Sequence, residues 1–353
     1  MSFGFQFDDS EMDEEYLSSS NAPFQPSTSP TTQQTSTSDQ APFCEHSLED
    51  MLEHLPSRIS YSSIDISLSS GSGSSQPYKL LRRDLFDARF QMLLDEDDHS
   101  NSQVDTHSDL IPNVYEGGLK TWECALDLVE VLHTHSTTDH KHILELGCGT
   151  ALPSLFLFSN LLASSNRAGV TLHLADYNAQ VLQLVTLPNL LLTWYASPAG
   201  SHYRSLEASH RSHEQQELSR RGQEHFATDE AELAITDELL AAFSESLASR
   251  GIQVKIYSGA WSGFPQSLVA GKMDLILTSE TIYSLESLPA LVELLGRYAG
   301  GQVLVAAKVI YFGVGGGVES FKQVLAQLHP TARVEPVHSV TKGVGRTVLS
   351  VTF

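Results

Sequence analysis

The sequence has few of the features that would support a disulfide framework or a membrane span. It holds only three cysteines in 353 residues, Cys44, Cys124 and Cys148, and they form no CxxC pair. No apolar run reaches about 18 residues, the length of a transmembrane helix. The N-terminus is acidic and shows no basic and apolar signal peptide. We therefore expect a soluble protein of a reducing compartment, in the cytoplasm and the nucleus.

Positive charge is also scarce. The chain has 21 Lys and Arg against 43 Asp and Glu, which gives a formal net charge of −22. Such a balance argues against direct binding of nucleic acid or of an anionic membrane surface. It leaves open a basic protein as partner, and we expect the chain itself to be a monomer.

Several nucleotide-binding and metal-binding motifs are missing. There is no GxGxxG spacing and no GxxxxGK[ST], which argues against nicotinamide cofactors and against a P-loop. The histidines His202, His210 and His213 invite a metal site, but no paired Cys and no HExxH arrangement accompanies them. We interpret them as solvated histidines and expect no metal.

What is present is an alternation of short apolar runs and helical periods. It predicts an α/β fold, a Rossmann-like sheet of seven mostly parallel strands with one antiparallel strand, and helices on both faces. Residues 1–43 are acidic and Ser/Thr-rich and should be disordered. Residues 44–108 should form an extension that packs on the core, and 109–353 the main domain with a low-complexity insertion at 196–250.

Three helices have specific local signals. Ser47 followed by Asp50 predicts a short capped helix over 47–52. Residues 82–94 have helical spacing. A further helix is expected over 179–192, although Pro188 should end or kink it.

One motif organises the main domain. An apolar strand ends in Glu145, and Gly147 and Gly149 then form a sharp turn into a helix. The next strand, 171–175, ends in Asp176, which either accepts from a ribose hydroxyl pair or caps the following helix. Further polar or bare-backbone groups end later strands, and all should meet in one crevice. Ribose and backbone contacts without a pyrophosphate cradle suit S-adenosylmethionine.

These motifs resemble a known class. Glu145-x-Gly147-x-Gly149 with an acid after the second strand resembles seven-strand S-adenosylmethionine-dependent methyltransferases, with Ala151 in place of the usual third glycine. More specific segments resemble the protein-histidine methyltransferase family, namely 114–124, 176–178, 186–189, 277–283 and 308–318. Residues 55–62 and 82–87 resemble fungal members.

The resemblance implies transfer of a methyl group to a histidine of a basic large-subunit ribosomal protein. We expect methylation of the tele nitrogen, and the choice between the two ring nitrogens stays open. The same resemblance implies cofactor contacts at Thr121, Trp122, Glu123, Cys124, Ala125, Gly147, Ala175, Asp176, Tyr177, Gly259, Ala260, Trp261 and Ser279. Among these, Trp122 would face the sulfonium in a cation–π contact, and Glu123 would bind the amino group. Trp261 or Tyr177 would flank the adenine.

For the chemistry, a neutral imidazole is a fair nucleophile near pH 7. Its second nitrogen carries a proton and needs an acceptor. Glu280 is our candidate, with Tyr283 as a second, although Glu280 equally suits a helix cap. The loop 311–317 would shape the mouth of the site. Methylation of a lysine or of a small molecule on the same fold stays open, as does a non-catalytic scaffold.

Overall fold

The structure, a computed structural model, describes residues 40–68, 77–96, 118–134, 140–164, 169–209, 231–268, 272–311, 313 and 315–353. Residues Asp39–Phe353 form one compact unit. Nearly all of the predicted tail lies outside the described residues, as do 114–117, His210 and His213. Within the described ranges, no helix has the length and apolar character needed to cross a membrane, and no group of ligating side chains could hold a metal ion.

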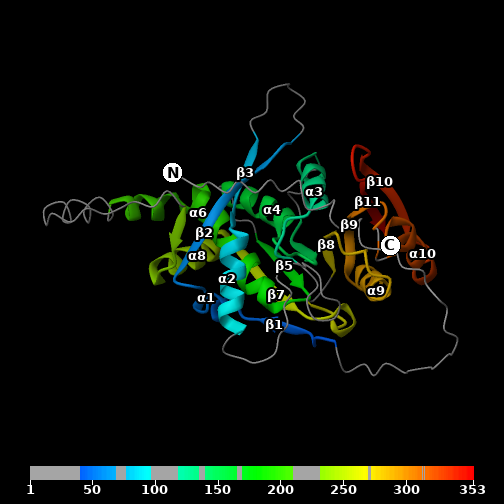
Figure 1. Ribbon diagram of the computed structural model, residues 1–353, viewed down its shortest axis with the longest axis horizontal. Helices are drawn as coiled ribbons and strands as arrows, with labels where there is room; N and C mark the ends of the chain where they lie inside the picture. The colour runs from blue at the N-terminus through cyan, green and yellow to red at the C-terminus, as the bar shows by residue number, and fades with distance from the viewer. Residues whose placement is uncertain are drawn as a thin grey trace, which may run out of the picture. The chain divides into compact units, whose positions relative to one another are not determined.

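The predicted mixed sheet is confirmed, with one more strand than expected (Figure 1). Its strand order is β1-β7-β5-β4-β8-β9-β11-β10. The five parallel strands are β4 (His142–Leu146), β5 (Val170–Asp176), β7 (Ile252–Ser258), β8 (Met273–Ser279) and β9 (Ala299–Lys308). At one edge β11 (Arg346–Thr352) runs antiparallel to β9 and pairs with β10 (Arg333–Val340). At the other edge the unpredicted β1 (Cys44–His46) pairs antiparallel with β7.

Helices cover both faces of this sheet, as predicted. One face carries α3 (Glu123–Thr134), α4 (Leu152–Ala163), α6 (Leu187–Ala196) and α8 (Asp237–Arg250), whose buried side chains share one core cluster. The other face carries α9 (Leu288–Tyr298) and α10 (Val318–Leu328) over a second cluster. Strand β5 is buried along its whole length, which is typical of a central parallel strand between two helix layers.

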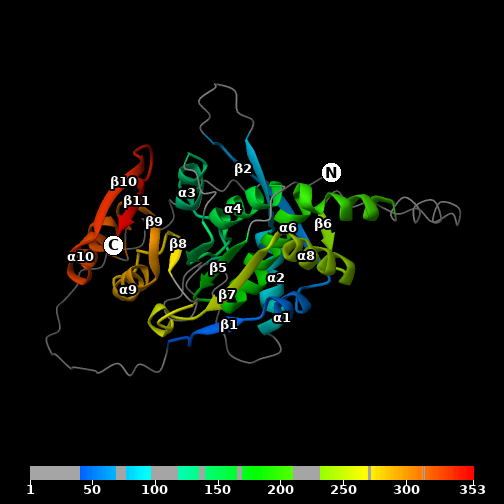
Figure 2. The same ribbon diagram turned by 180° about the vertical axis from the view of Figure 1, so that it is seen from behind.

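The chain before the main domain adds a second, three-stranded sheet of order β3-β2-β6 (Figure 2). It is built from β2 (Arg58–Ile66), β3 (Tyr78–Arg83) and β6 (Glu232–Ala234). The short helix α1 (Leu48–Glu53) begins as predicted, because the Ser47 side chain accepts from the backbone N–H of Asp50. The backbone N–H of Arg83 donates to Asn189 Oδ1 at 2.8 Å, which attaches this part to α6.

The helix predicted over 82–94 begins later than expected. Arg82 and Arg83 end strand β3, where they pair with β2, and helix α2 (Leu85–Glu96) follows. Backbone pairing with β2 and burial of the Arg83 guanidinium decide the local structure here. That guanidinium donates to Asp87, Gln91 and the carbonyl of Leu184.

The helix predicted over 179–192 is interrupted just before Pro188, in agreement with the expectation that this proline ends or kinks it. The chain runs through α5 (Ala179–Val181), a π-helical turn η2 (Leu182–Thr186) and α6, with Pro188 in the first turn of α6. A proline leaves the carbonyl four residues earlier without its helical donor. That carbonyl belongs to Leu184 and accepts from Arg83 Nη1 at 2.8 Å instead. The buried arginine therefore satisfies the backbone group that Pro188 leaves open.

The predicted insertion at 196–250 includes regular elements. A 3-10 turn η3 (Pro198–Gly200) and a helical stretch over 201–209 follow α6. Strand β6 then joins β2, and α8 packs its buried Leu239, Phe243 and Leu247 into the core that covers β7. The residues 231–250 thus belong to the connection between β5 and β7.

Candidate functional site

The carboxyl ends of three parallel strands meet at Gly147. Gly147 follows β4 at φ 66°, and a Cβ built on it would lie 2.4 Å from Cγ2 of Thr281 and 3.9 Å from the Trp261 ring. Thr281 follows β8, and Trp261 begins the turn η4 (Trp261–Gly263) after β7. Thr281 is fixed by a 2.6 Å hydrogen bond to Thr278, which donates to the Leu146 carbonyl. The strand ends therefore converge at Gly147, as predicted, and the backbone there carries no side chain.

The segment before α3 lies against the same turn. Gly149 has φ 47°, and a Cβ there would lie 3.1 Å from Cα of Gly118. Thr121 Oγ1 donates to Thr150 Oγ1 at 3.0 Å. Residues of two distant motifs thus form one layer, in which only glycine allows the two backbones to approach so closely.

Asp176 braces this turn from the end of β5. Its Oδ2 accepts from the Gly149 N–H at 2.9 Å, and its Oδ1 accepts from the Asn178 N–H at 3.1 Å. The residue is only 6% exposed. A carboxylate can accept from both hydroxyls of a ribose, which is one of the two roles that the sequence allowed for Asp176. Asn178, not Asp176, is the N-cap residue of α5.

Glu145 does not face the crevice, contrary to our expectation for the end of the first strand. It is 1% exposed, and its Oε2 accepts from the backbone N–H of Ser154 in the first turn of α4. It lies on the sheet face that α4 covers, because side chains alternate along a strand. Burial raises the pKa of Glu145 to about 8.

The cofactor contacts predicted at 121–125 and at 175 include both buried and exposed side chains. Cys124 is fully buried, Ala125 is 7% exposed, and Ala175 is fully buried with its carbonyl accepting from the Cys148 N–H. Their side chains belong to the core. Trp122, by contrast, is 41% exposed, and the Glu123 side chain is 58% exposed. Only these last two present large side chains at the surface.

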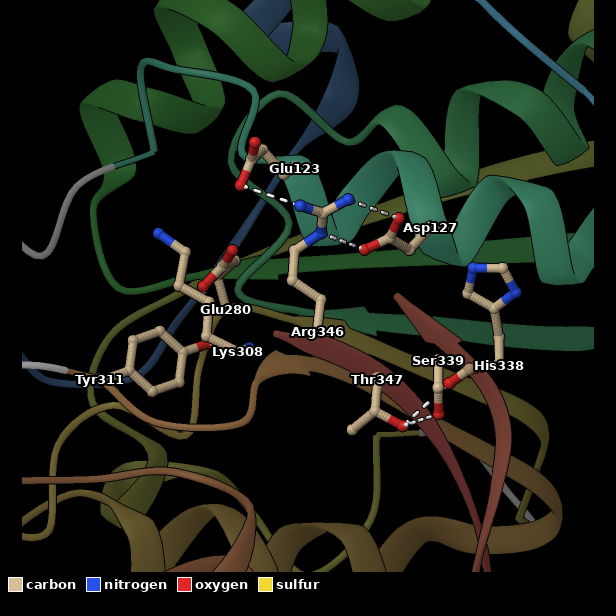
Figure 3. Close-up of polar contacts among 9 residues, drawn as sticks. All are labelled: Glu123, Asp127, Glu280, Lys308, Tyr311, His338, Ser339, Arg346 and Thr347. Atoms are coloured by element: carbon tan, nitrogen blue, oxygen red, sulfur yellow. Dashed lines mark hydrogen bonds and ion pairs between the residues drawn. The ribbon is translucent and has the colours of Figure 1, made fainter. Parts of the chain in front are cut away.

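Trp122 and Glu123 each contact a cationic side chain, and Figure 3 shows the contact of Glu123 with Arg346. The Lys308 ammonium lies 5.1 Å from the centroid of the Trp122 ring, a cation–π contact. Arg346 makes an ion pair of 3.3 Å with Glu123, and its Nε and Nη2 donate to the two carboxylate oxygens of Asp127 at 2.6 and 3.2 Å. These contacts connect the end of β9, the first turns of α3 and the start of β11.

The loop after β7 is covered by the residues that precede β1. Gly259 has φ 115°, and a Cβ there would lie 2.4 Å from the carbonyl oxygen of Pro42. The Ala260 N–H donates to the Ala41 carbonyl, and the Ala41 N–H donates to the Tyr177 hydroxyl at 3.4 Å. Four of the predicted residues, Tyr177, Gly259, Ala260 and Trp261, thus lie together, beside a segment that the sequence did not point to.

Glu280 lies where β8 ends, directly after Ser279. It adopts φ 58°, a left-handed conformation that is uncommon for a residue other than glycine and is often found at functional sites. Its Oε2 accepts from the Tyr311 hydroxyl at 2.6 Å, while its Oε1 is buried and has no partner with hydrogen-bond geometry among the described residues. Burial, the Glu280 charge and hydrogen bonding to Glu280 raise the pKa of Tyr311 and of Cys124, so both remain protonated.

Tyr283, the second catalytic candidate, packs against Tyr311. Its ring is 6.3 Å from that of Tyr311 in an edge-to-face arrangement. Tyr311, which also accepts from the Lys308 N–H at 3.2 Å, is therefore the tyrosine in contact with Glu280. The sequence analysis placed Tyr311 only in a loop at the mouth, and it missed Lys308 and Arg346 as partners of site residues. The available signal for Lys308 and Tyr311 was the family resemblance of the segment 308–318, which assigned neither residue a partner.

This arrangement fits a sulfonium-bearing nucleoside. The Gly147 turn exposes bare backbone beside Thr281, the Asp176 carboxylate braces that turn from the end of β5, and the Trp122 ring contacts a cation. The fold and this pocket define an S-adenosylmethionine-dependent methyltransferase with a Rossmann-like sheet.

The comparisons with known proteins narrow this class. No model of a protein family matches the chain. Histidine protein methyltransferase 1 of Saccharomyces cerevisiae is 36% identical over 298 residues, which cover 77% of this chain and 76% of that protein. Its counterpart in Schizosaccharomyces pombe is 34% identical over 322 residues, covering 86% and 83%. The chain therefore belongs to the histidine protein methyltransferase family.

Solved structures resemble the chain only weakly. The rRNA methyltransferase aviRa from Streptomyces viridochromogenes aligns with a TM-score of 0.36 and 15% identity, over 71% of this chain and 93% of that one. A similarity of this size supports no conclusion about the site.

Proposed function

We propose that this chain methylates the tele nitrogen of a histidine in a basic large-subunit ribosomal protein, with Glu280 as the group that accepts the proton of the other ring nitrogen. The observation that carries this proposal is the state of Glu280. One carboxylate oxygen accepts from Tyr311, and the other is buried and has no partner with hydrogen-bond geometry among the described residues, although the Cys124 thiol also interacts with this carboxylate. A buried acceptor without a well-formed hydrogen bond is costly, and a ligand N–H would satisfy it.

The cofactor would lie along the strand ends, held by Gly147, Asp176, Trp122, Glu123 and Trp261. When bound, S-adenosylmethionine supplies an electrophilic methyl group on a sulfonium. The chain's own contribution on this side is position: a rigid glycine turn braced by Asp176, and a Glu123 carboxylate whose direction is set by Arg346. Fixed placement of reacting groups can supply roughly 7–11 kcal/mol of a barrier.

Glu280 would act on the acceptor. A neutral imidazole has one N–H, and only the nitrogen without a proton can attack. An acceptor for the N–H of the pros nitrogen selects the tautomer in which the tele nitrogen is the nucleophile. Methylation makes the ring an imidazolium, and a carboxylate placed beforehand stabilises that developing positive charge. Tyr311 holds the carboxylate in position by donating to its other oxygen.

The nature of the protein substrate has two supports. The formal net charge of −22 favours encounter with a basic protein, because long-range attraction raises association rates. The family resemblance of the segments 114–124 and 308–318 points to a large-subunit ribosomal protein in particular. The names of the yeast relatives support histidine as the acceptor.

The experiment uses the full chain, methyl-deuterated S-adenosylmethionine and ribosomal proteins extracted from large subunits of cells that lack the enzyme. Mass spectrometry of the digested proteins should find the label on one histidine, and amino-acid analysis should identify the tele isomer. A reaction without the chain is the control. Label on lysine would overturn the proposal, and so would the absence of label from a chain that binds the cofactor in calorimetry.

A further inference from the structure

Four large apolar side chains are exposed around the Glu280–Tyr311 pair. They are Leu285, Val309, Ile310 and Val344, exposed by 53%, 42%, 57% and 40% respectively, and we call them the apolar rim. They come from three segments: the turn after β8, the loop after β9 and the hairpin between β10 and β11. Single exposed apolar residues are ordinary, but a group around one pocket marks an interaction site.

Backbone contacts tie the three segments together. The Val309 N–H donates to the Gly345 carbonyl at 2.8 Å, which places Val309 beside the residue that follows Val344. Ile310 forms an antiparallel bridge with Gly317, and Ser284 forms one with Gly315. A Cβ on Gly315 would lie 3.4 Å from Leu285 Cδ1. The apolar rim is therefore one connected part of the surface.

The exposure of these side chains is imposed by the backbone. A Cβ on Gly316 would lie 2.1 Å from the carbonyl oxygen of Tyr283, and one on Gly317 would lie 2.7 Å from that of Val309. The glycines thus let the loop after β9 press against its neighbours on both sides. A loop held in this way presents Ile310 to solvent at a fixed position next to Tyr311, whose hydroxyl contacts Glu280.

We infer that the apolar rim is the docking surface for the protein substrate, and that it receives a basic, extended segment on either side of the target histidine. This inference rests on the proposed function and adds the surface that recognises the partner. The rim borders the carboxylate at which the histidine would be held. An exposed acid, Glu286, follows Leu285, and the chain carries a net charge of −22, which suits a positively charged segment.

Ile310 is the position for the test, because it is more than half exposed and tolerates a change without loss of the core. Two variants, Ile310→Lys and Ile310→Glu, remove the same apolar contact and add opposite charges. For extracted large-subunit ribosomal proteins, Ile310→Lys should raise KM about tenfold and Ile310→Glu about threefold, with little change in kcat, since the contact is made equally in the ground and transition states. S-adenosylmethionine affinity should stay at the wild-type value.

Phe86→Lys and Phe86→Glu are the matched controls, since Phe86 is 81% exposed on α2, and neither should change KM. Binding of each variant to the immobilised ribosomal proteins is measured beside turnover. If both Ile310 variants keep wild-type KM and binding, the assignment of the docking surface is wrong. If Ile310→Glu binds the ribosomal proteins more weakly than Ile310→Lys, the basic character of the segment is wrong. If the wild type binds without methylating and Ile310→Lys loses binding, the surface stands while the proposed reaction fails.

Discussion

The two sides of the pocket are built from different parts of the chain. The glycine side, formed by Gly118, Gly147 and Gly149, consists of backbone held in place by the packing of Gly118 against Gly149 and by Asp176. The charged side, formed by Glu280, Lys308, Tyr311 and Arg346, consists of side chains that contact partners far away in sequence. Glu280 and Tyr311 are 31 positions apart, and Arg346 and Asp127 are 219 apart.

This difference follows from what each side has to bind. A nucleoside lies against a flat wall, and absent side chains provide the space for it. A reacting imidazole needs an acceptor at one point, which requires a long side chain fixed by further hydrogen bonds. We therefore expect substitutions on the glycine side to affect cofactor binding first, and those on the charged side to affect turnover first.

The largest effect is expected on the glycine side. Gly147→Ala would place a Cβ 2.4 Å from Thr281 Cγ2 on a residue at φ 66°, so the turn must move or Thr281 must break its hydrogen bond with Thr278. We expect calorimetry to show a loss of S-adenosylmethionine affinity of about 100-fold, close to 3 kcal/mol.

The control for this change is Gly169→Ala. Gly169 also has positive φ, 57°, but nothing lies within 4 Å of a Cβ built there, so it carries the conformational cost without the collision. Its thermal midpoint should fall slightly while cofactor affinity stays the same. Cofactor affinity within threefold of wild type in Gly147→Ala would show that the glycine turn does not form the binding wall.

The glycine side is also the side that the sequence could predict. Gly147, Gly149 and Asp176 belong to short motifs at strand ends, and the order of strands and helices follows from local periodicity. Even here Glu145 was misjudged. Which face of β4 its side chain occupies depends on the helix that packs there, and only the structure shows that α4 does so.

The charged side could not be predicted to the same degree. Tyr311 reaches Glu280 because β8 and β9 are neighbours in the sheet, and no local pattern states that adjacency. The three residues of β1 were likewise too few to carry a period of their own. Arg83 donates to the Leu184 carbonyl, which loses its helical donor at Pro188. A prediction based on the proline alone could not foresee this contact.

Substitutions on the charged side should lower turnover and leave cofactor affinity unchanged. Glu280→Gln keeps the shape of the side chain and replaces one acceptor oxygen by a donor, so kcat should fall about 100-fold, within the range for lost general-base assistance. Tyr311→Phe removes the donor that holds the carboxylate and should lower kcat about tenfold. Calorimetry should give wild-type affinity for S-adenosylmethionine in both.

Tyr283→Phe is the comparison that decides between the two tyrosines. The Tyr283 ring lies against Tyr311 but the hydroxyl contact with Glu280 belongs to Tyr311, so Tyr283→Phe should cost less turnover than Tyr311→Phe. The reverse order would reassign the positioning role to Tyr283. Normal turnover in Glu280→Gln would remove the carboxylate from the mechanism.

A measurement of stability tests whether Glu145 belongs to the pocket at all. Its folded-state pKa is raised to about 8 from 4.5, mainly by desolvation, so between these pH values the folded chain holds a proton that the unfolded chain has released. The free energy of unfolding should therefore decrease as the pH rises, with a slope from this residue of up to about 1.4 kcal/mol per pH unit.

Glu145→Gln retains an oxygen for the Ser154 N–H and cannot titrate, so the decrease between pH 6.5 and 8 should be smaller in the variant than in the wild type. His173, whose burial lowers its pKa to about 4, changes stability in the opposite sense below pH 6.5, and its contribution cancels in the difference between the two proteins. Urea unfolding at several pH values measures this difference, and calorimetry at pH 7 should give unchanged cofactor affinity. If the free energy of unfolding changes with pH equally in the variant and the wild type, the buried Glu145 carboxyl is already ionised and paired. A large loss of S-adenosylmethionine affinity in Glu145→Gln would show that Glu145 contributes to the pocket.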